Sequence, residues 1–312
     1  MDDATGQSRR GLLKCMVWAG TGVVWTVAGG IPRSRLIGSA EAATPDHDFS
    51  FVQLSDSHIG FSHDPNTDVP ATLQAGVDAI KTLPQPPSLL IHTGDVSHLS
   101  KPAQFDTAAQ IIGGAKLEAH YVPGEHDVLE DEGKSFIERF QKGAQQGAPD
   151  GAFYSFDQQG VHFIGLNNVV NLRAGGMGNL GEAQLAWLAS DLQGRSASQP
   201  IVVFAHIPLW TVAAAWGWGT EDAARALTLL KPFGSVTVLN GHIHQVMQKV
   251  EGNVAFHTAR STAFPQPAPG TAPSPGPMHV EPGRLRSVLG VTSVAYVPGQ
   301  SHLAIVDSTL GA

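Results

Sequence analysis

Short strand-like apolar segments alternate with segments of helical periodicity along most of this 312-residue chain. Residues 70–83 carry apolar side chains at helical spacing, between strand-like runs at 49–54 and 89–91. Such repetition of strand, loop and helix constrains the chain to an α/β fold whose early sheet is mostly parallel. Further strands are predicted at 119–122, 154–156, 161–166, 201–205, 236–239, 246–250, 254–258 and 303–306, and further helices at 102–113, 181–193 and 220–231.

The pattern predicts one large domain, because no linker-like stretch interrupts it. Residues 264–283 hold seven prolines and three glycines, but strand-like sequence resumes afterwards. We therefore interpret this segment as a rigid, extended loop within the domain. It is either a lid or partner surface, or a plain surface excursion.

The first 42 residues resemble a twin-arginine (Tat) export signal. Arg9 and Arg10 precede an apolar run at 15–31, and the small residues Ala40 and Ala42 suit a signal peptidase. We expect cleavage near Ala42, a mature domain at 43–312, the Tat machinery as a partner, and a periplasmic or secreted protein. The alternative is an uncut membrane anchor, for which the run is short.

Charge and cysteine content exclude several functions. The chain has 19 basic and 27 acidic side chains; without residues 1–42 it keeps 14 and 24, a net charge of −10. A surface this acidic repels polyanions, so no nucleic-acid polymer is expected as a partner. Cys15 is the single cysteine, which excludes a disulfide framework and a cysteine-rich zinc site.

Polar side chains of metal-binding type follow five of the predicted strands. In open α/β sheets, ligands bind beyond the carboxyl ends of strands, so these residues are expected to meet. Asp56 and His58, like His242 and His244, stand two residues apart, and extended chain points such pairs to one side. The full set is Asp56, His58, Asp95, Glu125, His206, His242 and His244.

This mixture of imidazole nitrogen and carboxylate oxygen suits Mn, Fe, Zn, Ni or Co better than Ca or Mg. Seven ligands exceed what one tetrahedral ion needs. They fit two divalent or mixed-valence transition-metal ions that share a bridging carboxylate.

The order of motifs resembles the calcineurin-like metallophosphoesterases: Asp-x-His, Gly-Asp, Gly-(Asn)-His-Asp, His and Gly-His-x-His, spread over residues 49–258. The resemblance implies a four-layer α/β/β/α sandwich. It also implies a dinuclear centre at which a metal-held hydroxide attacks phosphorus in line with the leaving oxygen.

Carried over by motif, one metal would be held by Asp56, His58, Asp95 and His244, and the other by Asp95, Glu125, His206 and His242. Asp95 would bridge the two. His126 would face the substrate and protonate the leaving group or stabilise phosphate oxygens, with Asp127 orienting its ring.

The chain departs from the family at Glu125, where the family has Asn. A carboxylate binds metal more tightly, blunts its Lewis acidity and cannot donate a hydrogen bond to phosphate. Three interpretations fit: Glu125 tunes metal choice with activity kept, it slows the chemistry and marks another substrate, or the protein binds metal without this catalysis.

Two further features bear on the subfamily and the substrate. Purple acid phosphatases have Tyr three residues after the Gly-Asp aspartate; here that residue is His98, and the site is similar to bacterial class III cyclic-nucleotide phosphodiesterases. Trp210, Trp216 and Trp218 either line the site or pack the sandwich edge. Arg260 is the best candidate for a phosphate contact among few basic residues.

These patterns predict an exported dinuclear metal hydrolase acting on a phosphomonoester or phosphodiester. The alternative is a non-hydrolytic metal- or partner-binding protein of the same fold, with catalysis blunted by Glu125 and the proline-rich loop as a docking element. His126 and Asp127 favour the enzyme, since metal binding alone has no use for them.

Overall fold

The computed structural model describes residues 22–28, 31–37, 49–141, 146–147, 153–296 and 303–311. The chain divides into two units, Met1–Asp46 and His47–Ala312. In the first unit, β1 (Gly22–Ala28) and β2 (Ile31–Ile37) pair antiparallel. The twin arginines and the expected cleavage site near Ala42 lie outside the described residues, so the export signal stays a prediction.

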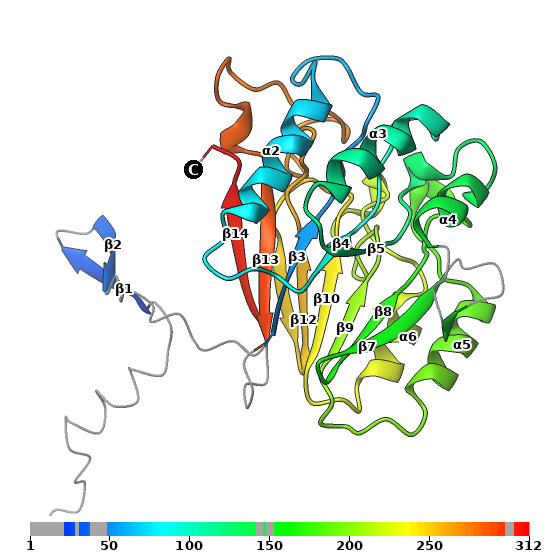
Figure 1. Cartoon of the computed structure of the whole chain (residues 1–312). Helices are drawn as coiled ribbons and strands as arrows, with labels where there is room; N and C mark the ends of the chain where they lie inside the picture. Colours follow the sequence, from blue (N-terminus) through cyan, green and yellow to red (C-terminus); the bar gives the residue numbers. More distant parts are fainter. Residues whose placement is uncertain are drawn as a thin grey trace, which may run out of the picture. The chain divides into compact units, whose positions relative to one another are not determined.

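The second unit contains two sheets (Figure 1). The five-stranded sheet has the order β14-β13-β3-β4-β5, in which β3, β4 and β5 are parallel and β13 runs antiparallel to both β3 and β14. Its strands are β3 (Phe49–Leu54), β4 (Leu89–His92), β5 (Glu118–Tyr121), β13 (Gly290–Tyr296) and β14 (Ala304–Thr309).

The seven-stranded sheet has the order β11-β12-β10-β9-β8-β7-β6, with four parallel strands from β12 to β8. Its strands are β6 (Gln146–Gly147), β7 (Tyr154–Gln158), β8 (Val161–Gly165), β9 (Ile201–Phe204), β10 (Val236–Asn240), β11 (Gln248–Glu251) and β12 (Val254–Thr258). Parallel strands need crossover connections, and helices provide several of these.

Helices cover the outer faces of the two sheets. Side chains of α2 and α3 pack in one core with β3 and β4, and those of α5 and α6 pack in another with β8, β9 and β10. Figure 1 shows the resulting four layers, which confirm the expected α/β/β/α sandwich. The α-helices are α2 (Val69–Lys81), α3 (Pro102–Gly113), α4 (Lys134–Phe140), α5 (Glu182–Leu192) and α6 (Ala223–Leu230).

A third core lies between the two sheets and holds them together. Phe49 and Phe51 of β3 contact Phe163 of β8 edge to face, with the Phe51 and Phe163 centroids 5.3 Å apart. All three rings are buried. This aromatic packing fixes how the carboxyl ends of the two sheets meet.

Local sequence explains where the elements begin and turn. The Asp68 side chain accepts a hydrogen bond from the Ala71 amide at the start of α2, whose buried residues follow a helical repeat. Gln159 and Gly160 both have positive φ, 49° and 81°. Positive φ at both central residues gives the tight hairpin turn that matches strand twist.

Several elements are absent from the sequence prediction: β1, β2, β6, β13 and α4. Strand β13 follows the proline-rich loop, and its Thr292 and Ser293 interrupt the apolar pattern, yet it is buried beside β3. Helix α4 has only seven residues, too few for a clear periodicity. Within the described residues, no helix combines the length and apolar character needed to cross a membrane.

The Phe51→Ala variant tests the core between the sheets. We expect its free energy of unfolding to fall by about 3–5 kcal/mol, because a large buried ring is lost from a close-packed site. Urea denaturation measures this. Val250→Ala on edge strand β11, whose side chain is exposed, should change stability by less than about 0.5 kcal/mol. Equal losses in both variants would contradict the packing described.

Candidate metal centre

The predicted site residues follow the carboxyl ends of strands from both sheets. Asp56 and His58 follow β3, Asp95 follows β4, and Glu125 and His126 follow β5. From the other sheet, His206 follows β9, and His242 and His244 follow β10. The sandwich brings these loops to one place, although the residues are up to 188 positions apart in the chain.

Five of these residues have left-handed backbone conformations. The φ angles are 52° at Asp56, 42° at His58, 52° at Asp95, 69° at His242 and 54° at His244. Side-chain-bearing residues pay a conformational cost there, which surrounding structure must offset. Backbone bonds from Asp56 N to Gly94 O (3.0 Å) and from His58 N to Asp95 O (2.8 Å) hold two of them.

The glycines before Asp95 and Glu125 are required by close approach. A methyl group on Gly94 would overlap the His206 ring, and one on Gly124 would overlap the Asp95 carboxylate. The Gly of each motif therefore lets neighbouring loops pack at van der Waals contact.

Within the described residues, five overlapping groups of three side chains could each hold a cation. Asp56, His58 and His244 form the first group considered, and Glu125, His206 and His242 form the second. Asp95 lies between them, with its Oδ2 3.4 Å from Nε2 of both His58 and His206. The structure thus brings the predicted ligand residues together, and their division between two metals stays a prediction.

Backbone carbonyls orient three of the histidine rings. In each case the ring Nδ1 is the donor: His206 donates to Thr93 O (2.7 Å), His244 to Phe264 O (2.6 Å) and His126 to His98 O (2.8 Å). A carbonyl only accepts, so each Nδ1 carries a proton, and Nε2 is the ring nitrogen left for a metal or a substrate. Carbonyl-anchored rings of this kind are the usual outer shell of metal-binding histidines.

Several of the possible ligand atoms make no hydrogen bond within the protein and are therefore available to a metal. Glu125 Oε2, His206 Nε2 and His242 Nε2 are buried and make no hydrogen bond, although the first two atoms lie 2.9 Å apart. Buried polar atoms without a partner are costly in a folded protein. Glu125 Oε2 and His206 Nε2 converge with Asp95 Oδ2, and this mixture of carboxylate oxygen and imidazole nitrogen suits a divalent transition metal.

Charges inside the cluster control its pKa values. Burial raises the pKa of Asp56, but His244, His206 and Ser55 outweigh it and lower that pKa to about 2. Burial and neighbouring histidines lower the pKa of His58 well below its usual value, so its ring is neutral. An anionic carboxylate and a neutral imidazole are the forms that bind metal.

The second group carries an excess of negative charge. Burial opposes ionisation of Glu125, yet His242 and His206 lower its pKa well below the usual value. Burial likewise disfavours charged His206, but Asp95 and Glu125 raise its pKa well above the usual value. A proton on His206 thus balances part of the negative charge of Asp95 and Glu125. A bound cation would neutralise the same charge.

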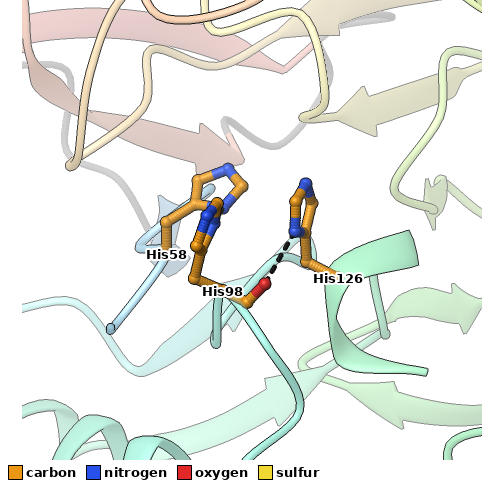
Figure 2. A group of neighbouring side chains, drawn as sticks. All are labelled: His58, His98 and His126. Atoms are coloured by element: carbon orange, nitrogen blue, oxygen red, sulfur yellow. Dashed lines mark hydrogen bonds between the residues drawn. The ribbon is translucent and has the colours of Figure 1, made fainter. Parts of the chain in front are cut away.

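His98 is a site residue that the sequence analysis did not assign. Figure 2 shows it with His58 and His126; its ring stacks on His126 (centroids 4.8 Å apart, 16° between planes), and its Nδ1 is 3.3 Å from His58 Nδ1. The three form a further group of possible ligands. Its place three residues after Asp95 was the available signal.

The expected role of Asp127 is wrong, because its carboxylate does not touch the His126 ring. It accepts hydrogen bonds from the backbone amides of Val96, Ser97 and Gly124 and from Ser97 Oγ. The carbonyl of His98 orients His126 instead. Asp127 thereby ties the loops after β4 and β5 together.

Arg260 is not brought to the site. Its Nη1 donates to Val288 O, near the far edge of the five-stranded sheet, and its side chain does not line the cavity over the metal ligands. A phosphate contact from Arg260 therefore has no geometric support.

A cavity of about 340 Å³ opens over the two groups of ligands. His58, Asp95, Glu125, His242 and His244 form its floor, together with His98 and His126. Trp216, Trp218 and the proline-rich loop at 275–277 form its walls, whereas Trp210 packs on Phe256. Of the two interpretations of the tryptophans, lining the site therefore holds for Trp216 and Trp218. Part of the proline-rich loop also lines the cavity, and its role as a lid or partner surface stays a prediction.

Comparison with known proteins decides the family. Residues 49–246 match the Calcineurin-like phosphoesterase family. The chain belongs to this family, and it is a phosphoric ester hydrolase. Members use divalent metal ions, in agreement with the donor groups described.

Curated relatives are phosphodiesterases by name. A 3′,5′-cyclic-nucleotide phosphodiesterase of Nostoc sp. is 24% identical over 225 residues, covering 69% of this chain and 79% of the relative. The glycerophosphodiester phosphodiesterase GpdQ of Enterobacter lignolyticus is 23% identical over 196 residues, covering 61% and 68%.

Solved structures share the fold. A dimetal phosphatase from Danio rerio has a TM-score of 0.60 at 13% identity, covering 85% of this chain and 97% of that one. A purple acid phosphatase from yellow lupin (Lupinus luteus) also scores 0.60 at 12% identity, covering 84% and 52%. At these identities the likeness concerns architecture alone.

Asp127→Ala tests the structural role of this carboxylate. Three buried amides and one hydroxyl lose their acceptor, so stability should fall by about 3 kcal/mol or more. Asp131→Ala is the control, because its similar bonds to Gly133 and Ser135 are partly exposed and water replaces them. Lost activity at unchanged stability, measured by thermal unfolding, would instead support the orienting role.

Proposed function

We propose that this protein is a dinuclear metal-dependent phosphodiesterase. The observation that carries the proposal is the position of Asp95, whose Oδ2 is equidistant from a histidine of each ligand group. In this proposal Asp56, His58 and His244 hold one cation, Glu125, His206 and His242 hold the other, and Asp95 is shared. When bound, the metals supply Lewis acidity and activate water as a nucleophile.

The protein side chains position the substrate and the leaving group. His126 has its Nδ1 engaged by His98 O, so Nε2 is the ring nitrogen left to act on an ester oxygen. His126 also lines the cavity beside Asp95 and Glu125. This geometry supports the proton-donating or oxygen-stabilising role expected for His126.

Charge favours a diester over a monoester. Two divalent cations among Asp56, Asp95 and Glu125 leave a net charge of +1, whereas an Asn at 125 would leave +2. None of the described residues lining the cavity is Lys or Arg. A singly charged phosphodiester therefore suits the site better than a doubly charged monoester. Both curated relatives are named for diester substrates.

Metal content and turnover test the proposal together. The purified protein, loaded in turn with Mn, Fe, Zn, Ni or Co, should contain about two metals per chain by mass spectrometry and hydrolyse bis-p-nitrophenyl phosphate. His126→Ala should retain both metals and lose about 10²–10⁴-fold in kcat, because proton transfer is lost.

Absence of turnover with every metal, at two metals per chain, would favour the rival function. That rival is a non-hydrolytic metal- or partner-binding protein, in which Glu125 suppresses catalysis. One metal per chain with turnover intact would overturn the dinuclear arrangement and leave the hydrolase.

Glu125→Asn tests the charge argument. Removal of one negative charge should raise phosphodiesterase turnover, and it should raise monoester hydrolysis more, by about tenfold relative to diester hydrolysis. Paired kcat/KM values for p-nitrophenyl phosphate and bis-p-nitrophenyl phosphate measure this. Glu125→Gln is the matched control of equal length. Unchanged selectivity in both variants would refute the argument.

Export by the Tat route is the remaining part of the proposal. Its support is the sequence pattern from Arg9 to Ala42. In this interpretation the phosphodiester is encountered outside the cytoplasm, which favours scavenging over intracellular signalling.

A further inference from the structure

The walls of the cavity differ sharply from its floor. All the acidic and histidine side chains that line it belong to the floor described above. The remaining lining side chains are apolar apart from one amide, and they are Leu172, Trp216, Trp218, Phe264, Gln266, Pro275 and Pro277. A phosphoester bound to the floor therefore projects an ester group between apolar walls.

Trp216 is held rigidly in one of these walls. It ends a short 3₁₀ turn, Ala214–Trp216, whose ends are joined by bonds from Val212 N to Trp218 O (2.7 Å) and from Trp218 N to Ala213 O (3.1 Å). Its ring stands edge-on to the buried Trp218, with centroids 5.0 Å apart. Trp218 is only 1% exposed, so it fixes the ring of Trp216 from behind.

The opposite wall is tied to the metal ligands. Gln266 Nε2 donates to His242 O (2.9 Å), and Gln266 Oε1 accepts from Gly276 N (3.1 Å). Met278 N donates to Pro265 O, which closes the base of the loop. Each polar atom of the Gln266 side chain is thus engaged once, so the wall keeps only one amide N–H and one lone pair for a substrate.

The size of the cavity limits what the walls can hold. About 340 Å³ lies at the small end for ligand pockets. A closed cavity of about 150 Å³ is enough for one benzene ring. The space therefore accommodates a phosphate and one flat ring system between rigid walls.

From these observations we propose that Trp216 stacks on an aromatic ring carried by one ester group of the substrate, such as an aryl group or a nucleobase. A hydroxyl-rich group such as glycerol would bury several polar atoms against walls whose only hydrogen-bonding side chain is Gln266, which is costly. The inference rests on the proposed phosphodiesterase function, since it names the substrate class of that site.

Calorimetry with two non-hydrolysable ligands tests the inference without turnover. Phenylphosphonate and methylphosphonate carry the same anionic group and differ in the ring alone. On the metal-loaded protein, at a pH where both are dianions, phenylphosphonate should bind about tenfold or more tightly, as expected for ring stacking.

Substitutions of Trp216 test whether its indole ring causes the preference for phenylphosphonate. Trp216→Ala and Trp216→Leu should both abolish it, the second with an apolar side chain kept at the site, whereas Trp216→Phe should keep most of it. Trp187→Ala is the matched control, because this half-buried tryptophan lies on α5 outside the cavity. Thermal unfolding confirms that each variant is folded.

Equal affinity for the two phosphonates, or a preference that survives in Trp216→Leu, would overturn the inference. Loss of bis-p-nitrophenyl phosphate hydrolysis with the ring preference intact would count against the proposed function alone. The two failures are therefore distinguishable in the same set of proteins.

Discussion

The main physical constraint on this structure is the clustering of seven ionisable side chains in one mostly buried site. Three carboxylates and four imidazoles meet where the carboxyl ends of two sheets face the same cavity, and most are almost fully buried. Such a cluster is costly unless its charges are compensated. Without a cation, the raised pKa of His206 and the unbonded atoms of Glu125 and His242 record that cost. Metal ions remove it, so the cluster and its cofactor are best understood together.

This arrangement requires strained backbone conformations at several of the site residues. Left-handed conformations are tolerated in the loops that directly follow rigid strands. The residues that adopt them are Asp56, His58, Asp95, His242 and His244. The contact between Phe51 and Phe163 holds the two sheets against each other. Asp127 joins the loops that follow β4 and β5. Pre-organised ligands of this kind need little rearrangement when the metal binds.

Function divides between the floor and the walls of one cavity. The floor supplies the carboxylate and imidazole groups that could hold metal. The walls come from segments outside those motifs: the loop at 211–219 and the proline-rich loop. In the function proposed here, reaction type and substrate preference are therefore carried by different parts of the chain.

Sequence alone determined the α/β class, most strand and helix positions, and the set of candidate ligands. Hydrophobic periodicity is a local property, and motifs such as Gly-His-x-His keep their spacing wherever the chain places them. Strand β13 was missed because polar Thr292 and Ser293 break its pattern; neighbours across the sheet and not propensity make it a strand. The contact partners of Asp127, Arg260 and His98 are set by residues distant in the chain, as are the walls around Trp216. Only the tertiary structure decided these, because the direction of a side chain depends on how separate loops pack against one another.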